Sequence, residues 1–223
     1  RLEDCSPDIR PLLPALLEKS SMVLLKLSPM ADISMLAGVF GQALREVHIV
    51  SLHSEVKELL CVLESGGRDS CRIHVVDLDS PGEEFSFTHE EENDAKTEYA
   101  SGAEAGEYLH EPCAGLLKSG AFHLTGERFG MKEADKSTRL SDSPVNSPLI
   151  RTFLIEHALP MNGEGLREAR KLYPCAGVSA RNVPVSSETL RGKLKVGEDP
   201  RRHIFGCSVA GRRTLLLCRR LAE

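Results

Sequence analysis

Hydrophobic and polar positions in the first third of the chain predict a helix, a strand, a second helix and a hairpin. Residues 7–19 have the spacing of an amphipathic helix, and MVLLKL at 22–27 reads as a short strand interrupted by one Lys. Its continuous apolar character indicates a strand covered on both faces, as in a parallel sheet. SPMADISML restarts a helix, and 45–64 alternates in two halves around His53-Ser54-Glu55, which is typical of an antiparallel hairpin. A βα unit followed by such a hairpin predicts one edge of an open α/β sheet.

The first residues carry the signals of a helix N-terminus. Ser6 is placed to be the N-cap, Pro7 is the first helical residue, and Asp8 falls in the first turn, where negative charge suits the helix dipole. A natural N-terminus rarely begins so abruptly inside regular structure. We therefore interpret the chain as the C-terminal part of a longer protein, with a processed or trimmed form as the alternative.

The middle of the chain combines a second hairpin, an acidic connection and a helical stretch. The segments 72–78 and 83–88 are joined by DSPG, in which Pro81-Gly82 is a favourable turn pair. Residues 90–107 are acidic, poor in apolar residues and contain glycines, which predicts a solvated or partly disordered connection. After Glu111-Pro112, the apolar spacing predicts a helical stretch.

The last 75 or so residues predict the order strand, helix, strand, helix, strand, strand. The segments are LIRTFLIEHAL, GLREARKLY, AGVSARNV, SETLRGKL, RHIFGCSVA and RTLLLCRRL. Ala210-Gly211 turns the final hairpin, and Ser186 or Ser187 is placed to cap the helix before it. We therefore expect a domain boundary near residue 148.

Composition limits the class of protein. The chain has 223 residues, of which 41% are hydrophobic, and no apolar run approaches the roughly 20 residues of a membrane span. The seven cysteines are widely spaced without a C-x-x-C pair, which indicates free thiols in a reducing compartment rather than a disulfide frame or a zinc site. We expect a cytoplasmic protein with no membrane partner and no metal.

Charge is distributed unevenly behind a net value of −5. Residues 83–111 hold ten acidic residues against one Lys, whereas 167–223 hold thirteen Lys and Arg against five acidic residues, an excess of +8. A basic module of this kind indicates a negatively charged partner such as nucleic acid.

Several phrases resemble a known family. LEDCSPDI, LLKLSPMADI and REVHIVSLHSEVKELL resemble the later part of bacterial class I S-adenosylmethionine-dependent methyltransferases that end in a THUMP-like domain. EPCAGLLKSGAF and ERFG resemble the ferredoxin-like intermediate segment of that family, and SARNVPVSSETLRGKLKV with HIFGCSVAGRRTLLLCRRL resembles the THUMP-like end. The resemblance implies an α/β and α+β fold with the C-terminal half of a Rossmann-like sheet at 1–65, a ferredoxin-like segment at 66–148 and a THUMP-like domain at 149–223.

The resemblance also implies where a cofactor and substrate would lie. The glycine-rich turn that binds S-adenosylmethionine in such enzymes has no counterpart here, so we expect the cofactor in the intact parent protein and no tight binding to this part. Strand ends in such sheets face the ligand crevice, which makes Lys26, Ser28 and Asp32 candidates for contact with substrate or cofactor. The alternative is that Lys26 snorkels and Ser28 caps the next helix.

THUMP-containing proteins grip tRNA-type RNA, so the resemblance and the charge together predict RNA binding by the C-terminal module. The candidate residues are Arg181, Asn182, Arg191, Lys193, Lys195, Arg201, Arg202, Arg212 and Arg213. The alternative is that they are ordinary solvated residues, and the absence of Trp leaves base stacking poorly supplied.

No catalytic residue is identified from the sequence. His48 and His53 flank a hairpin turn without a ligand spacing, and His74, His123 and His157 fit hydrogen-bonded structural roles. We therefore predict a substrate-binding part that is inactive as an enzyme by itself, with self-association through an incomplete sheet as a further expectation. The alternatives are a non-catalytic protein-interaction module and a methyltransferase that acts on a substrate other than RNA.

Overall fold

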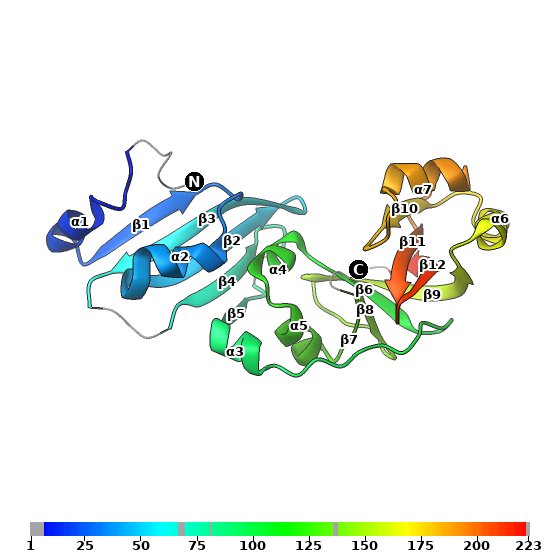
Figure 1. Cartoon of the computed structure of the whole chain (residues 1–223), viewed down its shortest axis with the longest axis horizontal. Coiled ribbons are helices and arrows are strands. Elements are labelled where there is room, and N and C mark those ends of the chain that lie inside the picture. Colours follow the sequence, from blue (N-terminus) through cyan, green and yellow to red (C-terminus); the bar gives the residue numbers. More distant parts are fainter. Residues whose placement is uncertain (1–6, 67–69, 81, 136–137, 222–223) are drawn as a thin grey trace. The chain divides into compact units, whose positions relative to one another are not determined.

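The computed structural model describes residues 7–66, 70–80, 82–135 and 138–221. The predicted cap Ser6 and Pro81 of the predicted turn lie outside these residues. The chain divides into an N-terminal unit, Arg1–Ala95 with Cys113–Ala121, and a C-terminal unit, Lys96–Pro112 with Phe122–Glu223. Each unit is built on one sheet (Figure 1). Of the helices within the described ranges, none is long and apolar enough to cross a membrane.

The N-terminal sheet has the strand order β1-β3-β2-β4-β5 among the described residues. Its strands are β1 (Met22–Leu27), β2 (Leu44–Leu52), β3 (Glu55–Glu64), β4 (Arg72–Asp77) and β5 (Phe85–Thr88). Its helices are α1 (Leu13–Lys19), α2 (Ile33–Phe40), the 3-10 turn η2 (Gly41–Ala43), α3 (His89–Asp94) and α4 (Ala114–Ser119). The two predicted hairpins are confirmed, since β2 pairs with β3 and β4 with β5, both antiparallel.

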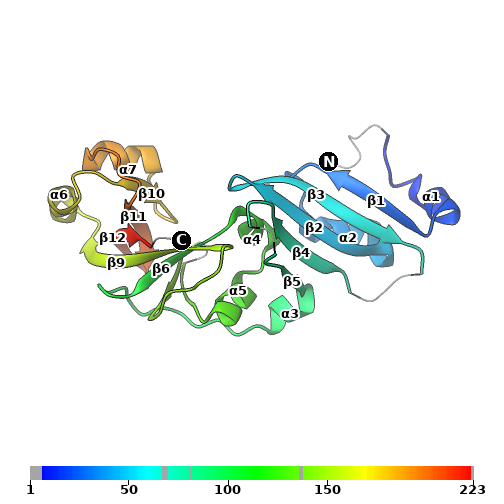
Figure 2. The same cartoon turned by 180° about the vertical axis from the view of Figure 1, so that it is seen from behind.

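One face of the N-terminal sheet forms the core of this unit. The alternate residues Val47, Ile49, Leu59, Ile73 and Val75 are fully buried, as period-2 side-chain placement requires for one covered face. Helices α2 and α4 lie on the same side of the sheet in Figures 1 and 2. α4 approaches closely because Gly115 has no side chain: a Cβ there would lie 2.7 Å from Cγ1 of Val75.

The prediction that residues 22–27 form a strand covered on both faces is wrong. β1 is the edge strand of the sheet and pairs antiparallel with β3. Met22 and Leu24 are 53% and 63% exposed. A continuous apolar run does not distinguish a central strand from an edge strand, because only the neighbouring elements determine which faces are covered.

The two sheets extend across residues 65 and 148, where the sequence analysis places domain boundaries. The N-terminal sheet continues beyond residue 65 because β4 pairs with β2 in parallel. The C-terminal sheet crosses residue 148 because β6 (Tyr108–Pro112) pairs with β9 (Ile150–Pro160). Between β6 and the next strand of that sheet, α4 belongs to the N-terminal unit. Strand pairing between distant segments therefore places in one sheet residues that the sequence analysis assigned to different domains.

The C-terminal sheet has the strand order β10-β11-β12-β9-β6-β8-β7 in the described part of the chain. Its other strands are β7 (Lys132–Asp135), β8 (Thr138–Ser141), β10 (Gly177–Ala180), β11 (Arg202–Val209) and β12 (Arg212–Arg220), and its helices are α5 (Phe122–Phe129), α6 (Gly163–Leu172) and α7 (Ser187–Leu194). The order of elements predicted for the last 75 residues is confirmed. Ser186 caps α7 by accepting a hydrogen bond from the Thr189 backbone N–H, and Ala210 and Gly211 turn the last hairpin with positive φ.

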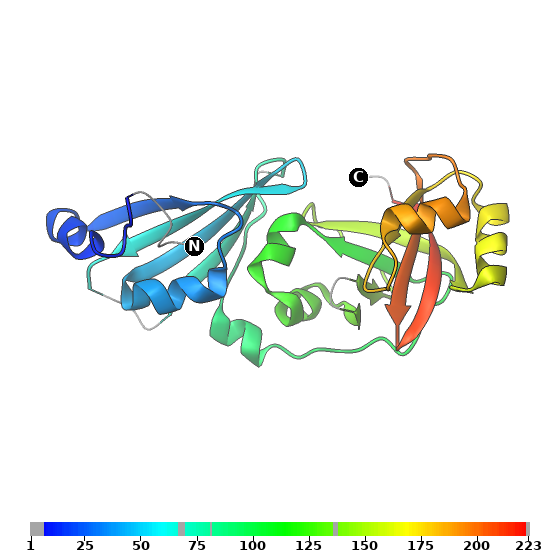
Figure 3. The same ribbon diagram turned by 45° about the horizontal axis from the view of Figure 1, so that its top comes forward.

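Both faces of the C-terminal sheet are covered near β11 and β12. On one face, α6 and α7 pack over a core that includes Leu190, Leu194, Ile204 and Leu217 (Figure 3). A second core includes the alternate side chains Phe205 of β11 and Leu216 of β12, together with Leu109 of β6 and Phe153 of β9.

Two expectations for the middle of the chain change in the structure. The helical stretch after Pro112 is two helices, because Gly120 adopts the left-handed conformation with φ 81° and ends α4. The acidic connection begins as the ordered helix α3, in which Thr88 and Glu91 form a reciprocal capping box. Farther along, Glu98 and Ala100 hydrogen-bond to the backbone of Glu133. Local capping and backbone pairing thus order a segment whose composition alone indicates disorder.

Candidate functional site

A pocket of about 400 Å³ lies in the N-terminal unit beside the start of α2. It is lined by Met30, Asp32, Ile33, Ser34, Phe87, His89, Glu92, Lys118, Ser119 and Gly120. Of the three crevice residues predicted from the sequence, Asp32 lines this pocket. The polar lining combines carboxylates with one ammonium group, so the pocket suits a small polar ligand.

Asp32 has a structural role at this pocket as well. Its carboxylate caps α2 by accepting hydrogen bonds from the Ser34 hydroxyl at 2.7 Å and the Ser34 backbone N–H at 3.0 Å. These hydrogen bonds hold the pKa of Asp32 below its usual value, the hydroxyl contributing most. Lys118 of α4 donates to the backbone carbonyl of Ala31 at 2.9 Å. The pocket therefore presents a negative charge that the helix end stabilises.

The other two predicted crevice residues do not line this pocket. Lys26 extends into solvent and lies 3.5 Å from the carboxylate of Glu58. Ser28 accepts a hydrogen bond from the Met30 backbone N–H, so it closes a local turn and is not the helix cap. The alternative role expected for Ser28 is thus wrong, because Asp32 occupies the capping position.

The nine basic-module residues predicted to bind RNA occupy three places in the C-terminal unit. The group that we name the α7–β11 basic end comprises Arg191, Lys193, Lys195, Arg201 and Arg202. Residues after α7 meet the start of β10 through the bridge between Gly197 and Cys175, and Gly177 of β10 pairs with His203 of β11. This pairing brings the end of α7 and the start of β11 to the same end of the sheet.

The remaining four candidates lie elsewhere. Arg212 and Arg213 lie at the opposite end of β11, where Val209 pairs with Arg212. Eight extended residues span roughly 23 Å, so one compact contact does not cover both ends. Arg181 and Asn182 follow β10, with the Arg181 N–H bonded to the Gly206 carbonyl.

Two of the predicted RNA-binding arginines are engaged within the protein. The Arg181 guanidinium binds the carboxylate of Glu111, which is 7% exposed and also pairs with Arg151 at 3.0 Å. The Arg202 guanidinium lies 4.9 Å from the centre of the Tyr173 ring, a cation–π distance. Arg181 therefore forms an internal ion pair, although its Nε has no hydrogen-bond partner among the described residues. Arg202 is exposed and makes a ring contact without an ion pair in the described part of the chain.

Three residues of the α7–β11 basic end are uncompensated. Lys193, Lys195 and Arg201 are exposed, and their charged groups have no carboxylate oxygen within 4.0 Å among the described residues. Asp199 accepts a hydrogen bond from the backbone N–H of Arg201 at 2.8 Å and does not pair with its guanidinium. Arg191 lies 3.6 Å from Glu198, but Glu198 is almost fully exposed, so this pair is weak. Sequence reasoning did not select the neighbouring exposed residues Arg167, Arg170 and Lys171 of α6, although their charge was visible.

Two histidines of the C-terminal unit, the buried His110 and the partly buried His203, have structural roles. His110 hydrogen-bonds Thr152 and Ser141, and His203 hydrogen-bonds Ser179. Burial lowers the pKa of each to about 4, so both imidazoles are neutral near pH 7.

His48 and His74 behave differently from the sequence interpretation. They lie side by side on β2 and β4, with their rings stacked 4.5 Å apart and Glu46 next to them. The sequence gives no signal for this, because the two histidines are 26 positions apart and meet only through the parallel pairing of their strands.

Comparisons with known proteins agree with the architecture. Residues 150–220 match the family of THUMP domain-like proteins, and residues 108–145 match a ferredoxin-like domain. A comparison with curated proteins found no match. A crystal structure described as that of a "putative methyltransferase" from Porphyromonas gingivalis W83 superposes with a TM-score of 0.92 at 32% sequence identity. The match covers 99% of this chain and 56% of that one, so the present chain spans little more than half of its structural relative. The chain thus combines a ferredoxin-like segment with a THUMP-like domain and is similar in fold to that protein.

Proposed function

We propose that this chain is the RNA-binding, substrate-positioning part of a cytoplasmic S-adenosylmethionine-dependent methyltransferase. The THUMP-like match at residues 150–220 and the likeness to the Porphyromonas gingivalis protein support the assignment. The proposal gives the C-terminal unit the task of holding RNA and leaves methyl transfer to the intact protein.

The observation that carries the proposal is the α7–β11 basic end. Its uncompensated cations, Lys193, Lys195 and Arg201, come from the end of a helix and the approach to a strand, on a well-packed scaffold. Phosphate neutralisation by such side chains releases counterions and supplies sequence-independent affinity for nucleic acid. RNA binding at this end positions a strand without reading its bases, which suits a module that presents a nucleotide to another part of an enzyme.

The residues of the N-terminal pocket do not fit a complete S-adenosylmethionine site. A class I site needs a glycine-rich turn after a strand at the carboxyl ends of parallel strands. The one glycine of the pocket lining, Gly120, ends α4, and β5, which contributes Phe87 to the lining, is antiparallel to its neighbour β4. We therefore assign the cofactor to another part of the protein and derive no catalytic step here.

The test is RNA binding as a function of salt. Fluorescence-labelled tRNA is titrated with the intact protein between 50 and 200 mM KCl, and the affinity is expected to fall steeply with salt. Lys193→Glu, Lys195→Asp and Arg201→Glu together remove three cations. Asp is chosen at position 195 because Lys195 has a left-handed φ of 53°, which Asp tolerates. We expect at least a tenfold loss of affinity at 100 mM KCl and a salt slope shallower by about 2–3.

Two matched variants serve as controls. Arg212→Glu with Arg213→Glu reverses two cations near the other end of β11. Lys57→Glu reverses one cation in the N-terminal unit. Both are expected to retain binding, with Arg212 and Arg213 contributing only long-range attraction. Salt-independent binding, or equal loss from the two ends, contradicts the proposed interface. Retention of RNA binding by the triple variant together with loss of a protein partner favours an interaction module instead.

A further inference from the structure

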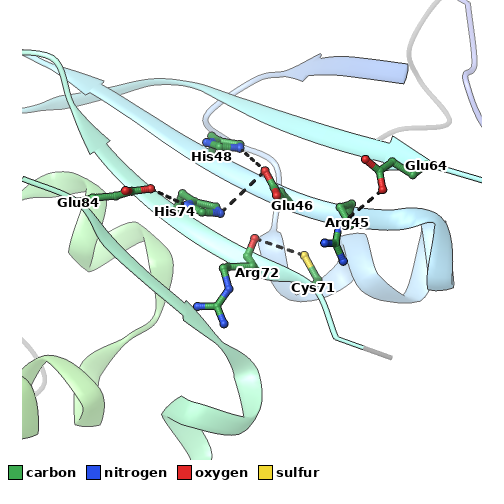
Figure 4. A network of polar contacts seen from close by, with 8 residues as sticks. All are labelled: Arg45, Glu46, His48, Glu64, Cys71, Arg72, His74 and Glu84. Atoms are coloured by element: carbon green, nitrogen blue, oxygen red, sulfur yellow. Dashed lines mark hydrogen bonds and ion pairs between the residues drawn. The ribbon is translucent and has the colours of Figure 1, made fainter. Parts of the chain in front are cut away.

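A cluster of histidines and carboxylates lies on the N-terminal sheet, whereas the residues assigned to RNA belong to the C-terminal unit. Glu46 and His48 come from β2, His74 comes from β4, and Glu84 precedes β5. Figure 4 shows the four side chains directed toward one another above the strands. The cluster plays no part in the proposed RNA interface.

Strand pairing explains why these residues meet. Glu46 and His48 are two positions apart on one strand and therefore share a face. The parallel register of β2 and β4 places His74 directly opposite His48. Val47, between Glu46 and His48, and Ile73, next to His74, point into the core and are fully buried. Their burial fixes the backbone positions of β2 and β4 beneath the cluster.

The distances are those of a preformed three-ligand set. Nε2 of His48 lies 3.0 Å and Nε2 of His74 lies 3.9 Å from Oε2 of Glu46. One ligand atom from each of the three residues lies within 4.8 Å of the others. Ligand bonds of about 2.0–2.2 Å in a tetrahedral zinc site place neighbouring ligand atoms roughly 3.3–3.5 Å apart, so small side-chain rotations suffice.

Glu84 orients His74 in the way that ligating histidines are usually held. Nδ1 of His74 lies 3.1 Å from Oε1 of Glu84, so donation to this carboxylate leaves the Nε2 lone pair directed toward Glu46. The His74 side chain is only 12% exposed, and its Nε2 has no hydrogen-bond partner among the described residues. A buried acceptor without a partner costs free energy, which a bound cation would recover.

The surrounding charges also favour a cation. Arg45 pairs with Glu64 at 3.6 Å and Arg72 with Glu91 at 3.8 Å, so the nearest guanidinium groups have other carboxylate partners. Two carboxylates, Glu46 and Glu84, would balance a divalent ion when both imidazoles are neutral. Two stacked histidines without a metal satisfy the ring contact but leave His74 Nε2 unpaired.

We propose that Glu46, His48 and His74 bind a divalent transition-metal ion, with zinc as the best match to two imidazoles and one carboxylate. Glu84 is a positioning residue that holds the His74 ring. Three protein ligands leave a fourth position for water or for an oxygen or nitrogen of a ligand.

The test measures metal binding directly. The intact protein is treated with a chelator, dialysed at pH 7.5 and titrated with ZnCl2 by calorimetry, and Co²⁺ is used to report coordination by visible absorption. We expect the wild type to bind one equivalent of Zn²⁺. In His48→Gln and in His74→Gln, the affinity of this site for Zn²⁺ should fall at least 100-fold. Glu84→Gln is expected to weaken binding about 10–100-fold while the stoichiometry is kept.

A matched histidine variant and a folding measurement complete the test. His53→Asn removes an exposed histidine that pairs with Asp79 in the same unit, and Asn suits its positive φ. This variant should bind Zn²⁺ as the wild type does. Thermal melts of the wild type with Zn²⁺ should show a higher Tm, which needs no variant to interpret. The proposal is overturned if the wild type neither gains Tm nor binds Co²⁺, or if His48→Gln and His74→Gln bind Zn²⁺ as tightly as His53→Asn.

Discussion

The N-terminal and C-terminal sheets differ in how many of their faces are covered by described residues. In β12, Leu215, Leu216, Leu217 and Cys218 are all fully buried, because helices cover one face and a second core covers the other. In β1, an equally apolar run leaves Met22 and Leu24 more than half exposed. Apolar side chains stabilise a fold in proportion to the area that they remove from water, so the two runs contribute very differently.

The largest expected effect comes from truncating matched leucines in these two strands. Leu217→Ala removes a fully buried side chain and should lower the unfolding free energy of the C-terminal unit by about 3 kcal/mol. Leu24→Ala should change stability by less than about 0.5 kcal/mol, because Leu24 is exposed. Urea unfolding of the 223-residue chain measures both. Equal losses would show that β1 is covered as fully as β12.

Acid should destabilise the C-terminal unit. The pKa of His110 and of His203 is lowered from 6.5 to about 4 by burial, so the native C-terminal unit binds fewer protons than its unfolded form between these values. This contribution to stability is intact above pH 6.5, is lost as the pH falls toward 4, and then levels off. Between pH 7 and pH 5, each of the two histidines should lower the unfolding free energy by about 2 kcal/mol.

A single substitution isolates this effect. His203→Gln should remove about 2 kcal/mol of the pH dependence of unfolding between pH 7 and pH 5 while an amide at this position still reaches Ser179. The exposed His53 provides the control as His53→Asn. An unchanged pH profile in His203→Gln would show that His203 titrates alike in the folded and unfolded chain.

Two glycine-to-alanine substitutions compare a filled position in α6 with an open one in α7. A Cβ at Gly165 of α6 would overlap the carbonyl oxygen of Pro160, whereas one at Gly192 of α7 would meet nothing within 4 Å. Gly165→Ala should destabilise by roughly 1–3 kcal/mol, and Gly192→Ala should stabilise by about 0.5–1 kcal/mol. Thermal melts of both variants measure the difference. The same sign of Tm shift in both would contradict the packing around α6.

Predictability from sequence follows the range of the interactions. The order of elements in the last 75 residues, the hairpin at 45–64 and a helix cap at Ser186 or Ser187 were predicted, because each rests on contacts between residues close in sequence. The exposure of β1, the inclusion of α4 in the N-terminal unit and the role of Glu111 as a partner of Arg181 were not. Each of these depends on a partner tens of residues away, which no local pattern identifies.

The candidate sites show the same division. The sequence determined that cations are concentrated after residue 167, and it placed Lys193, Lys195 and Arg201 among nine candidate residues. The structure shows that these three side chains are exposed. Only the tertiary structure decided which cations are neutralised, because ion pairs such as that of Arg181 and Glu111 join residues 70 positions apart. Parallel pairing of β2 with β4 likewise brought His74 beside His48, since strand register and not spacing along the chain sets which side chains meet.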